Sequence, residues 1–64
     1  MIEHRFKVGQ TVQATGTSFH LPRGQFRILR LLPSTAGGIP LYCVKSEVEL
    51  IERVVEQHEI KVAS

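Results

Sequence analysis

The stretch SEVELIERVVEQHEI, residues 46–60, decides between two folds. Read with a period near 3.6, it is an amphipathic helix, because Ser46 and Glu49 form a capping-box pattern and apolar residues recur along one side. Read as extended pieces, it is the closing strand of a small β-barrel. The β-branched Val54 and Val55 favour this second interpretation, since they lose rotamer freedom in a helix. Periodicity alone slightly favours the helix.

The rest of the chain favours strands. Alternating apolar and polar residues predict a short strand over residues 6–14, bent at Gly9, and a clear strand over residues 24–32. Residues 33–40 contain prolines and glycines and are expected to form a hairpin loop. Residues 41–46 then return as a further strand. In these last two strands Phe26, Ile28, Tyr42 and Val44 are expected to point inward, and Gln25, Arg27, Leu41, Cys43 and Lys45 outward.

The alternation fails at Arg30, which falls in phase with the buried positions Phe26 and Ile28. A β-bulge or a strong bend near Leu29 would resolve this conflict. Arg30 is further expected to pair with a glutamate of the acidic C-terminal segment.

Four segments together resemble a family of short, uncharacterised bacterial proteins with a small barrel of Src-homology-3 type: FKVGQTV (6–12), GQFRILRLLP (24–33), PLYCVKS (40–46) and ERVVEQHEI (52–60). The similarity spans residues 6–60. It implies that residues 52–55 form a strand and that residues 56–60 form a short turn before the end. The family has no established activity, so the resemblance informs the fold alone.

We therefore expect an all-β fold, a small five-stranded antiparallel barrel of Src-homology-3-like type. A chain of 64 residues makes one domain, because it buries only about 60% of its unfolded surface and supports a single core. Residues 1–4 and 61–64 are expected to be frayed. The alternative fold is α+β, with a three-stranded sheet and a C-terminal helix from Ser46 to about Val62.

A lone cysteine suits a reducing compartment. Cys43 is the single cysteine, and the sequence contains neither a signal-peptide pattern nor an apolar run long enough to cross a membrane, so we expect a cytoplasmic protein. The net charge of +2 does not by itself imply a nucleic-acid partner. Residues 1–46 contain six Lys and Arg against Glu3, whereas residues 47–64 contain five Glu, so one part of the surface is expected to be basic and another acidic.

Catalytic, metal and cofactor sites are not expected. The potential metal ligands His4, His20, Cys43 and His58 are spread singly along the chain, without the close pairs typical of zinc sites. Gly37 and Gly38 lack the Lys-Ser/Thr pattern of a phosphate-binding loop. A barrel this small fills its interior with its own side chains and leaves no substrate pocket. We therefore expect a protein without enzymatic activity, cofactor or metal.

The remaining function is binding. The residues expected to meet an anionic partner are Arg23, Arg27 and Lys45, with Phe19 and His20 in the adjoining loop. A protein partner, docked through an edge strand or a loop face, is the main hypothesis. The alternative is single-stranded nucleic acid, held by basic side chains with aromatic rings beside them.

The chain has more apolar residues than a small core can bury, which supports the hypothesis of a protein partner. Leu29, Leu31, Ile39 and Leu41 exceed what so small an interior must bury, so an exposed apolar patch is expected. Such a patch is compatible with a monomer that docks another protein or with a weak homodimer.

Overall fold

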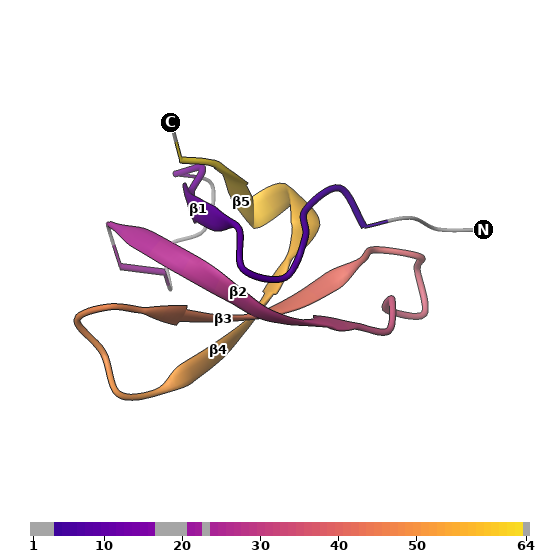
Figure 1. Cartoon of the computed structure of the whole chain (residues 1–64). Coiled ribbons are helices and arrows are strands. Elements are labelled where there is room, and N and C mark those ends of the chain that lie inside the picture. The colour runs from indigo at the N-terminus through magenta and orange to yellow at the C-terminus, as the bar shows by residue number, and fades with distance from the viewer. Residues whose placement is uncertain (1–3, 17–20, 23, 64) are drawn as a thin grey trace.

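The computed structural model describes residues 4–16, 21–22 and 24–63. In this part of the chain five strands form one antiparallel sheet in the order β4-β3-β2-β1-β5 (Figure 1). The elements are β1 (Thr11–Ala14), β2 (Gln25–Leu32), β3 (Leu41–Ser46), β4 (Glu52–Glu56), the 3-10 turn η1 (Gln57–Glu59) and β5 (Ile60–Val62). The prediction of an all-β fold with five antiparallel strands is confirmed. Between the described strands the sheet remains open, with β4 and β5 as its edges.

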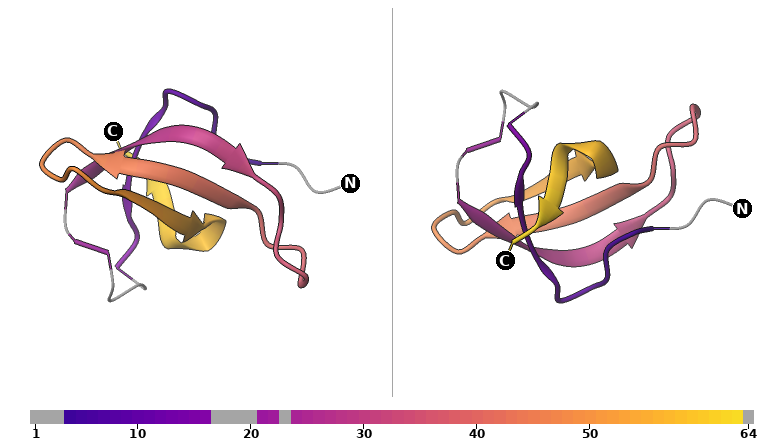
Figure 2. Two further views of the ribbon diagram at one scale, coloured as in Figure 1. Left: turned by 90° about the horizontal axis from the view of Figure 1, so that it is seen from below. Right: turned by 90° about the horizontal axis from the view of Figure 1, so that it is seen from above.

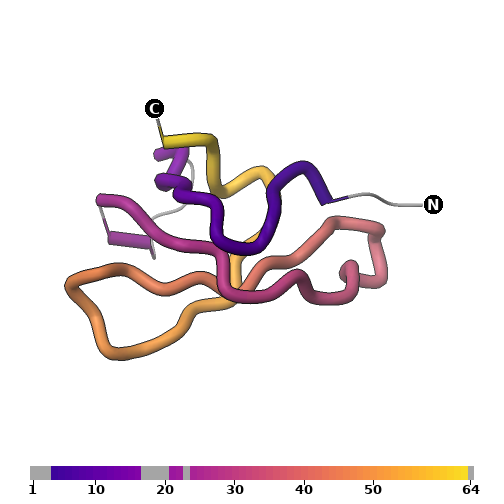
Figure 3. The backbone as a smooth tube through the Cα atoms, in the orientation of Figure 1, coloured from indigo at the N-terminus to yellow at the C-terminus, as the bar shows by residue number. Residues whose placement is uncertain are grey.

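The sheet is strongly curved. The sheet bends back on itself along β2. As a result, β1, β5 and η1 lie across one face of the layer formed by β2, β3 and β4 (Figure 2). The turn joining β3 to β4 projects from one end of this layer, and the β2–β3 loop projects from the other end (Figure 3). Lys61 belongs to β5, in a segment for which we expected fraying. No helix in the described ranges has the length and apolar content needed to span a membrane.

The C-terminal third is extended, so the alternative with a helix from Ser46 to Val62 is wrong. β4 pairs with β3 along its whole length, and Val55 lies opposite Tyr42 in the core. Ser46 and Glu49, which form the capping-box pattern in the sequence, lie in a tight turn instead of at the start of a helix. The hydroxyl of Ser46 accepts a hydrogen bond from the backbone N–H of Val48 (3.2 Å), and its carbonyl accepts one from Glu49 (3.4 Å). Pairing with β3 satisfies the backbone groups that a helix would otherwise satisfy internally.

The core lies inside the curve of the sheet. The predicted inward positions on β2 and β3 are all buried. Removing each large side chain from water stabilises the fold by about 1.5–3 kcal/mol. The core cluster contains residues from every strand, from the segment before β1 and from the β1–β2 connection: Phe6, Val12, Leu21, Phe26, Ile28, Tyr42, Val44, Val55 and Ile60. Leu21 therefore anchors the β1–β2 connection to the core, whereas Phe19 lies outside the described residues.

The predicted bulge occurs in β2. Ile28 pairs with Val44, but the next paired residue is Arg30, opposite Cys43, so Leu29 is the extra residue. The shift turns Arg30 away from the core that Ile28 helps to fill. A charged side chain thereby reaches the outer face without breaking the buried row.

The first predicted strand is shorter than expected. Only Thr11–Ala14 is a strand, and residues 6–10 form a turn in which Gly9 has φ +87°. The turn still pairs with β2: Gly9 donates to the carbonyl of Ile28 (2.8 Å), and Ile28 donates to that of Gln10 (3.0 Å). The glycine adopts a left-handed conformation that interrupts the strand, which explains why alternation on both sides of it was misleading.

Candidate docking surface on the outer face of the sheet

The structure brings together two of the five predicted site residues. Arg27 on β2 and Lys45 on β3 are cross-strand partners on the outer face of the sheet. Arg23, Phe19 and His20 lie outside the described residues. The basic face is therefore defined by Arg27 and Lys45.

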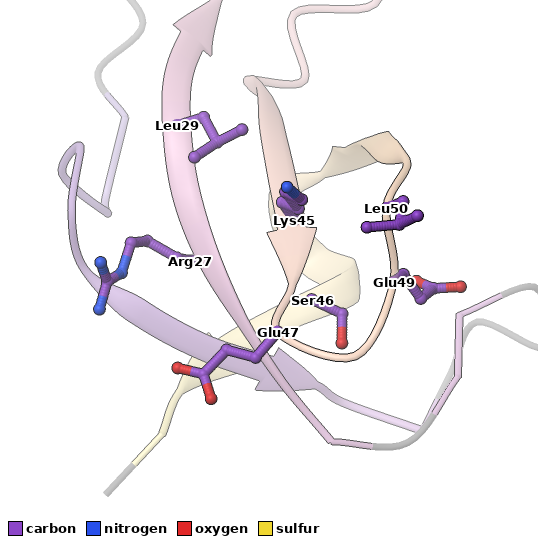
Figure 4. Close-up of a pocket in the computed structure, with 7 residues that line it drawn as sticks. All are labelled: Arg27, Leu29, Lys45, Ser46, Glu47, Glu49 and Leu50. Atoms are coloured by element: carbon purple, nitrogen blue, oxygen red, sulfur yellow. The ribbon is translucent and has the colours of Figure 1, made fainter.

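A hollow of ≈ 330 Å³ lies beside this pair, and we call it the outer hollow. Figure 4 shows Lys45 between Leu29, on the bulge of β2, and Leu50, in the β3–β4 turn. The outer hollow is lined by Arg27, Leu29, Lys45, Ser46, Glu47, Glu49 and Leu50. It therefore combines apolar walls with a cation between them.

The bulge and the turn both contribute residues to this arrangement. Leu29 is the residue left without a partner when the register of β2 shifts, and its half-buried side chain lies on the outer face. Leu50 comes from the connection of residues 47–51, which returns the chain from β3 to β4. A regular β2 would place the charged Arg30 over the core, whereas Leu29 faces outward in either case because it is two residues from Arg27.

Nearby carboxylates are largely occupied by other partners. Glu49 binds Arg53 through two hydrogen bonds (3.0 and 2.8 Å), and these bonds lower the pKa of the Glu49 carboxyl. Glu52, in register with Lys45, forms its ion pair with Arg30 at 3.1 Å. The pairing of Arg30 with a C-terminal glutamate is thus confirmed. Within the described residues neither member of the basic pair has an ion-pair partner.

Cys43 lies next to the Arg30–Glu52 ion pair, and its surroundings do not activate its thiol as a nucleophile. Its side chain is on the outer face, opposite the core, yet the residue is buried because Arg30 and Glu52 cover it. The thiol donates to the Glu52 carboxylate (3.1 Å). Burial first, and then this hydrogen bond, raise the pKa of the Cys43 thiol. A raised pKa disfavours the thiolate, which is the nucleophilic form.

The β3–β4 turn exposes a group of aliphatic side chains that the sequence did not single out. Leu50 is 95% exposed, Val48 88% and Ile51 57%. We call these three residues the apolar tip. Of the leucines and isoleucine expected to exceed the core, only Leu31 is exposed, while Leu29, Ile39 and Leu41 are half-buried. Among the described residues, the two most exposed large apolar side chains, Leu50 and Val48, thus lie in the turn.

The signal for the apolar tip is present in the sequence, but its meaning depends on the fold. Val48 and Ile51 belong to the stripe that makes residues 46–60 look helical. In a helix such a stripe would be buried against the sheet. In a turn it has no core to contact.

Among the described residues, no group of three or more His, Cys, Asp and Glu side chains is placed to hold a metal ion. Comparison with family models, with curated proteins and with solved structures yielded no match.

Proposed function

We propose that the protein is a non-catalytic binding module that docks a protein partner through the apolar tip and the adjoining outer hollow. One observation supports this most strongly: three large aliphatic side chains are exposed together on a single turn. Connecting turns normally carry polar residues, and runs of exposed apolar residues are retained where they serve binding. Covering them contributes about 25 cal/mol for each Å² of apolar surface removed from water.

The loop face fits this role better than the β4 edge of the sheet. Strand β4 is an edge strand, but three of its five residues are charged: Glu52, Arg53 and Glu56. Charges on an edge discourage the addition of a further strand. In the apolar tip the aliphatic side chains are themselves exposed, and a partner can contact them without adding a strand to the sheet.

We also propose that the curved sheet belongs to the small barrels of Src-homology-3 type, in a bacterial cytoplasm. Support comes from the strand order, in which β1 pairs with both β2 and β5, and from the bulge that bends β2 around the core. The resemblance of residues 6–60 and the single cysteine support the same proposal.

Affinity capture from the native host tests the docking function. The bait is the wild-type protein, a Leu50→Ser/Ile51→Ser double variant, or a Val8→Ser control whose residue is 60% exposed outside the apolar tip. Because all three side chains are exposed, the variants should melt within a few degrees of the wild type. We expect a partner that is retained by the wild type and the control and lost by the double variant. A partner set that is the same for all three baits would contradict the proposal.

Single-stranded nucleic acid is the second candidate, favoured by the Arg27–Lys45 pair. Against it, the described aromatic rings of Phe6, Phe26 and Tyr42 are buried and therefore unable to stack on bases. Retention of RNA or DNA that falls steeply between about 50 and 200 mM salt would favour this candidate, because phosphate contacts release counterions. A contact through the apolar tip responds little to salt.

A further inference from the structure

The outer hollow has the size and lining of a site for a single large side chain with part of its backbone. Its volume of ≈ 330 Å³ lies at the lower end of the range of small-ligand pockets, roughly 300–1,000 Å³. Leu29 and Leu50 provide apolar contact from two sides, and the Lys45 ammonium lies between them (Figure 4). An occupant that satisfies both features needs an apolar group and a negative charge close together.

The charges around Lys45 leave it available to such an occupant. Glu49 is held by Arg53, and Glu52 by Arg30. Figure 4 shows the side chain of Glu47 pointing away from Lys45. Arg27 is directly opposite in the register and adds a second positive charge to the same strand pair. Like charges opposite each other are unfavourable, and a bound carboxylate offsets this repulsion.

We propose that the outer hollow binds an extended segment of a partner protein in which a large apolar residue is next to Asp or Glu. The apolar side chain contacts Leu29 and Leu50, and the carboxylate pairs with Lys45. This inference rests on the proposed docking function and specifies the chemistry of the partner.

An NMR titration with synthetic peptides tests this chemistry. The probe is Ser-Gly-Asp-Leu-Asp-Gly-Ser, and the matched controls replace both Asp by Lys or replace Leu by Ser. We expect saturable shifts of the amide signals of Leu29, Lys45 and Leu50 with the acidic-apolar probe, and much weaker shifts with either control. Lys45→Gln should weaken binding roughly two- to fivefold, the range of an exposed ion pair. Lys61→Gln, an exposed lysine on β5, should leave binding unchanged.

Three outcomes would overturn the inference. Preference for the Lys-containing peptide would reverse the proposed charge, and equal binding of the Leu and Ser peptides would remove the apolar contact. Shifts of the same three amides on dilution of the protein alone would assign the outer hollow to a second copy of the chain.

The capture experiment separates failure of the inference from failure of the function. If no peptide moves the three amides while host capture still depends on Leu50 and Ile51, the partner chemistry is wrong and the docking function stands. If neither the peptides nor the Leu50→Ser/Ile51→Ser variant has an effect, both proposals fail.

Discussion

Arg27 lies directly opposite Lys45 in the antiparallel register of β2 and β3. Two cations thus occupy one cross-strand pair, while Glu52 and Glu49 are held by Arg30 and Arg53. Like charges directly opposite each other on paired strands are unfavourable, so we expect this pair to lower the stability of the free protein.

Replacing one cation of the pair should therefore stabilise the protein. We expect Arg27→Glu to raise the free energy of unfolding by about 0.2–1 kcal/mol, because an opposite-charge pair replaces a like-charge pair. Urea denaturation at low salt measures the change. Lys61→Glu, the same reversal on β5, is the control for net charge. An equal effect of both substitutions would show that the cross-strand pair has no energetic role.

Buried hydrogen bonding should make Tyr42→Phe destabilising. The Tyr42 hydroxyl donates to Oε1 of Gln57 (2.5 Å) and accepts from the backbone N–H of Phe6 (3.2 Å). Removing it leaves the Phe6 N–H without this partner at a buried position, at a cost of about 1–3 kcal/mol. The midpoint of urea unfolding reports the loss. Unchanged stability would mean that the turn of residues 6–10 is not tied to the core through this hydroxyl.

The Cys43 thiol predicts how stability depends on alkaline pH. Its pKa in the folded protein is raised above the ordinary value of 9.0, so the folded state retains the proton when the unfolded state has lost it. The contribution of the protonated thiol to the free energy of unfolding is fully present below pH 9. It is lost as the pH rises through the pKa of the thiol in the folded protein. Stability should consequently fall more steeply above pH 9 in the wild type than in Cys43→Ala. Parallel curves for the two proteins would contradict the burial of the thiol.

Glu49 predicts the opposite dependence in acid. Hydrogen bonds from Arg53 lower the pKa of its carboxyl below the ordinary value of 4.5. The stabilising effect of the ionised carboxylate is therefore present above pH 4.5 and lost as pH falls through the lowered pKa. We expect Glu49→Gln to be less stable than the wild type at pH 7 and equal to it near pH 2. Denaturation at the two pH values measures this, and a difference that persists in acid would assign the effect to something other than the ion pair.

The alternation of apolar and polar residues predicted the strands well where a charged residue in the buried phase could be accommodated in only one way. Arg30 could not share the face of Phe26 and Ile28 without burying a charge, so the bulge could be inferred from three residues. The inward positions Tyr42 and Val44 followed from alternation in the same way. Gly9 shows the limit, because the same alternation is compatible with a strand and with a turn that pairs through its backbone.

The candidate site was predictable only in part. Arg27 and Lys45 could be placed on the outer face, but their direct opposition depends on the register that the bulge sets. The apolar tip could not be recognised, since Val48 and Ile51 fit a buried helical stripe as well as an exposed turn. Cys43 was placed on the correct face, but its burial results from side chains of Arg30 and Glu52, which sequence spacing does not bring together.

The central claim is that residues 46–60 form a turn and a paired strand, which exposes the apolar tip. Backbone chemical shifts from NMR, together with cross-strand contacts between Cys43 and Val54, test it most directly. We predict extended shifts throughout Glu52–Glu56, a contact between the Cys43 and Val54 backbones, and no continuous helix across residues 47–51. Uninterrupted helical shifts from Ser46 to Val62 would contradict the fold and remove the docking surface that depends on it.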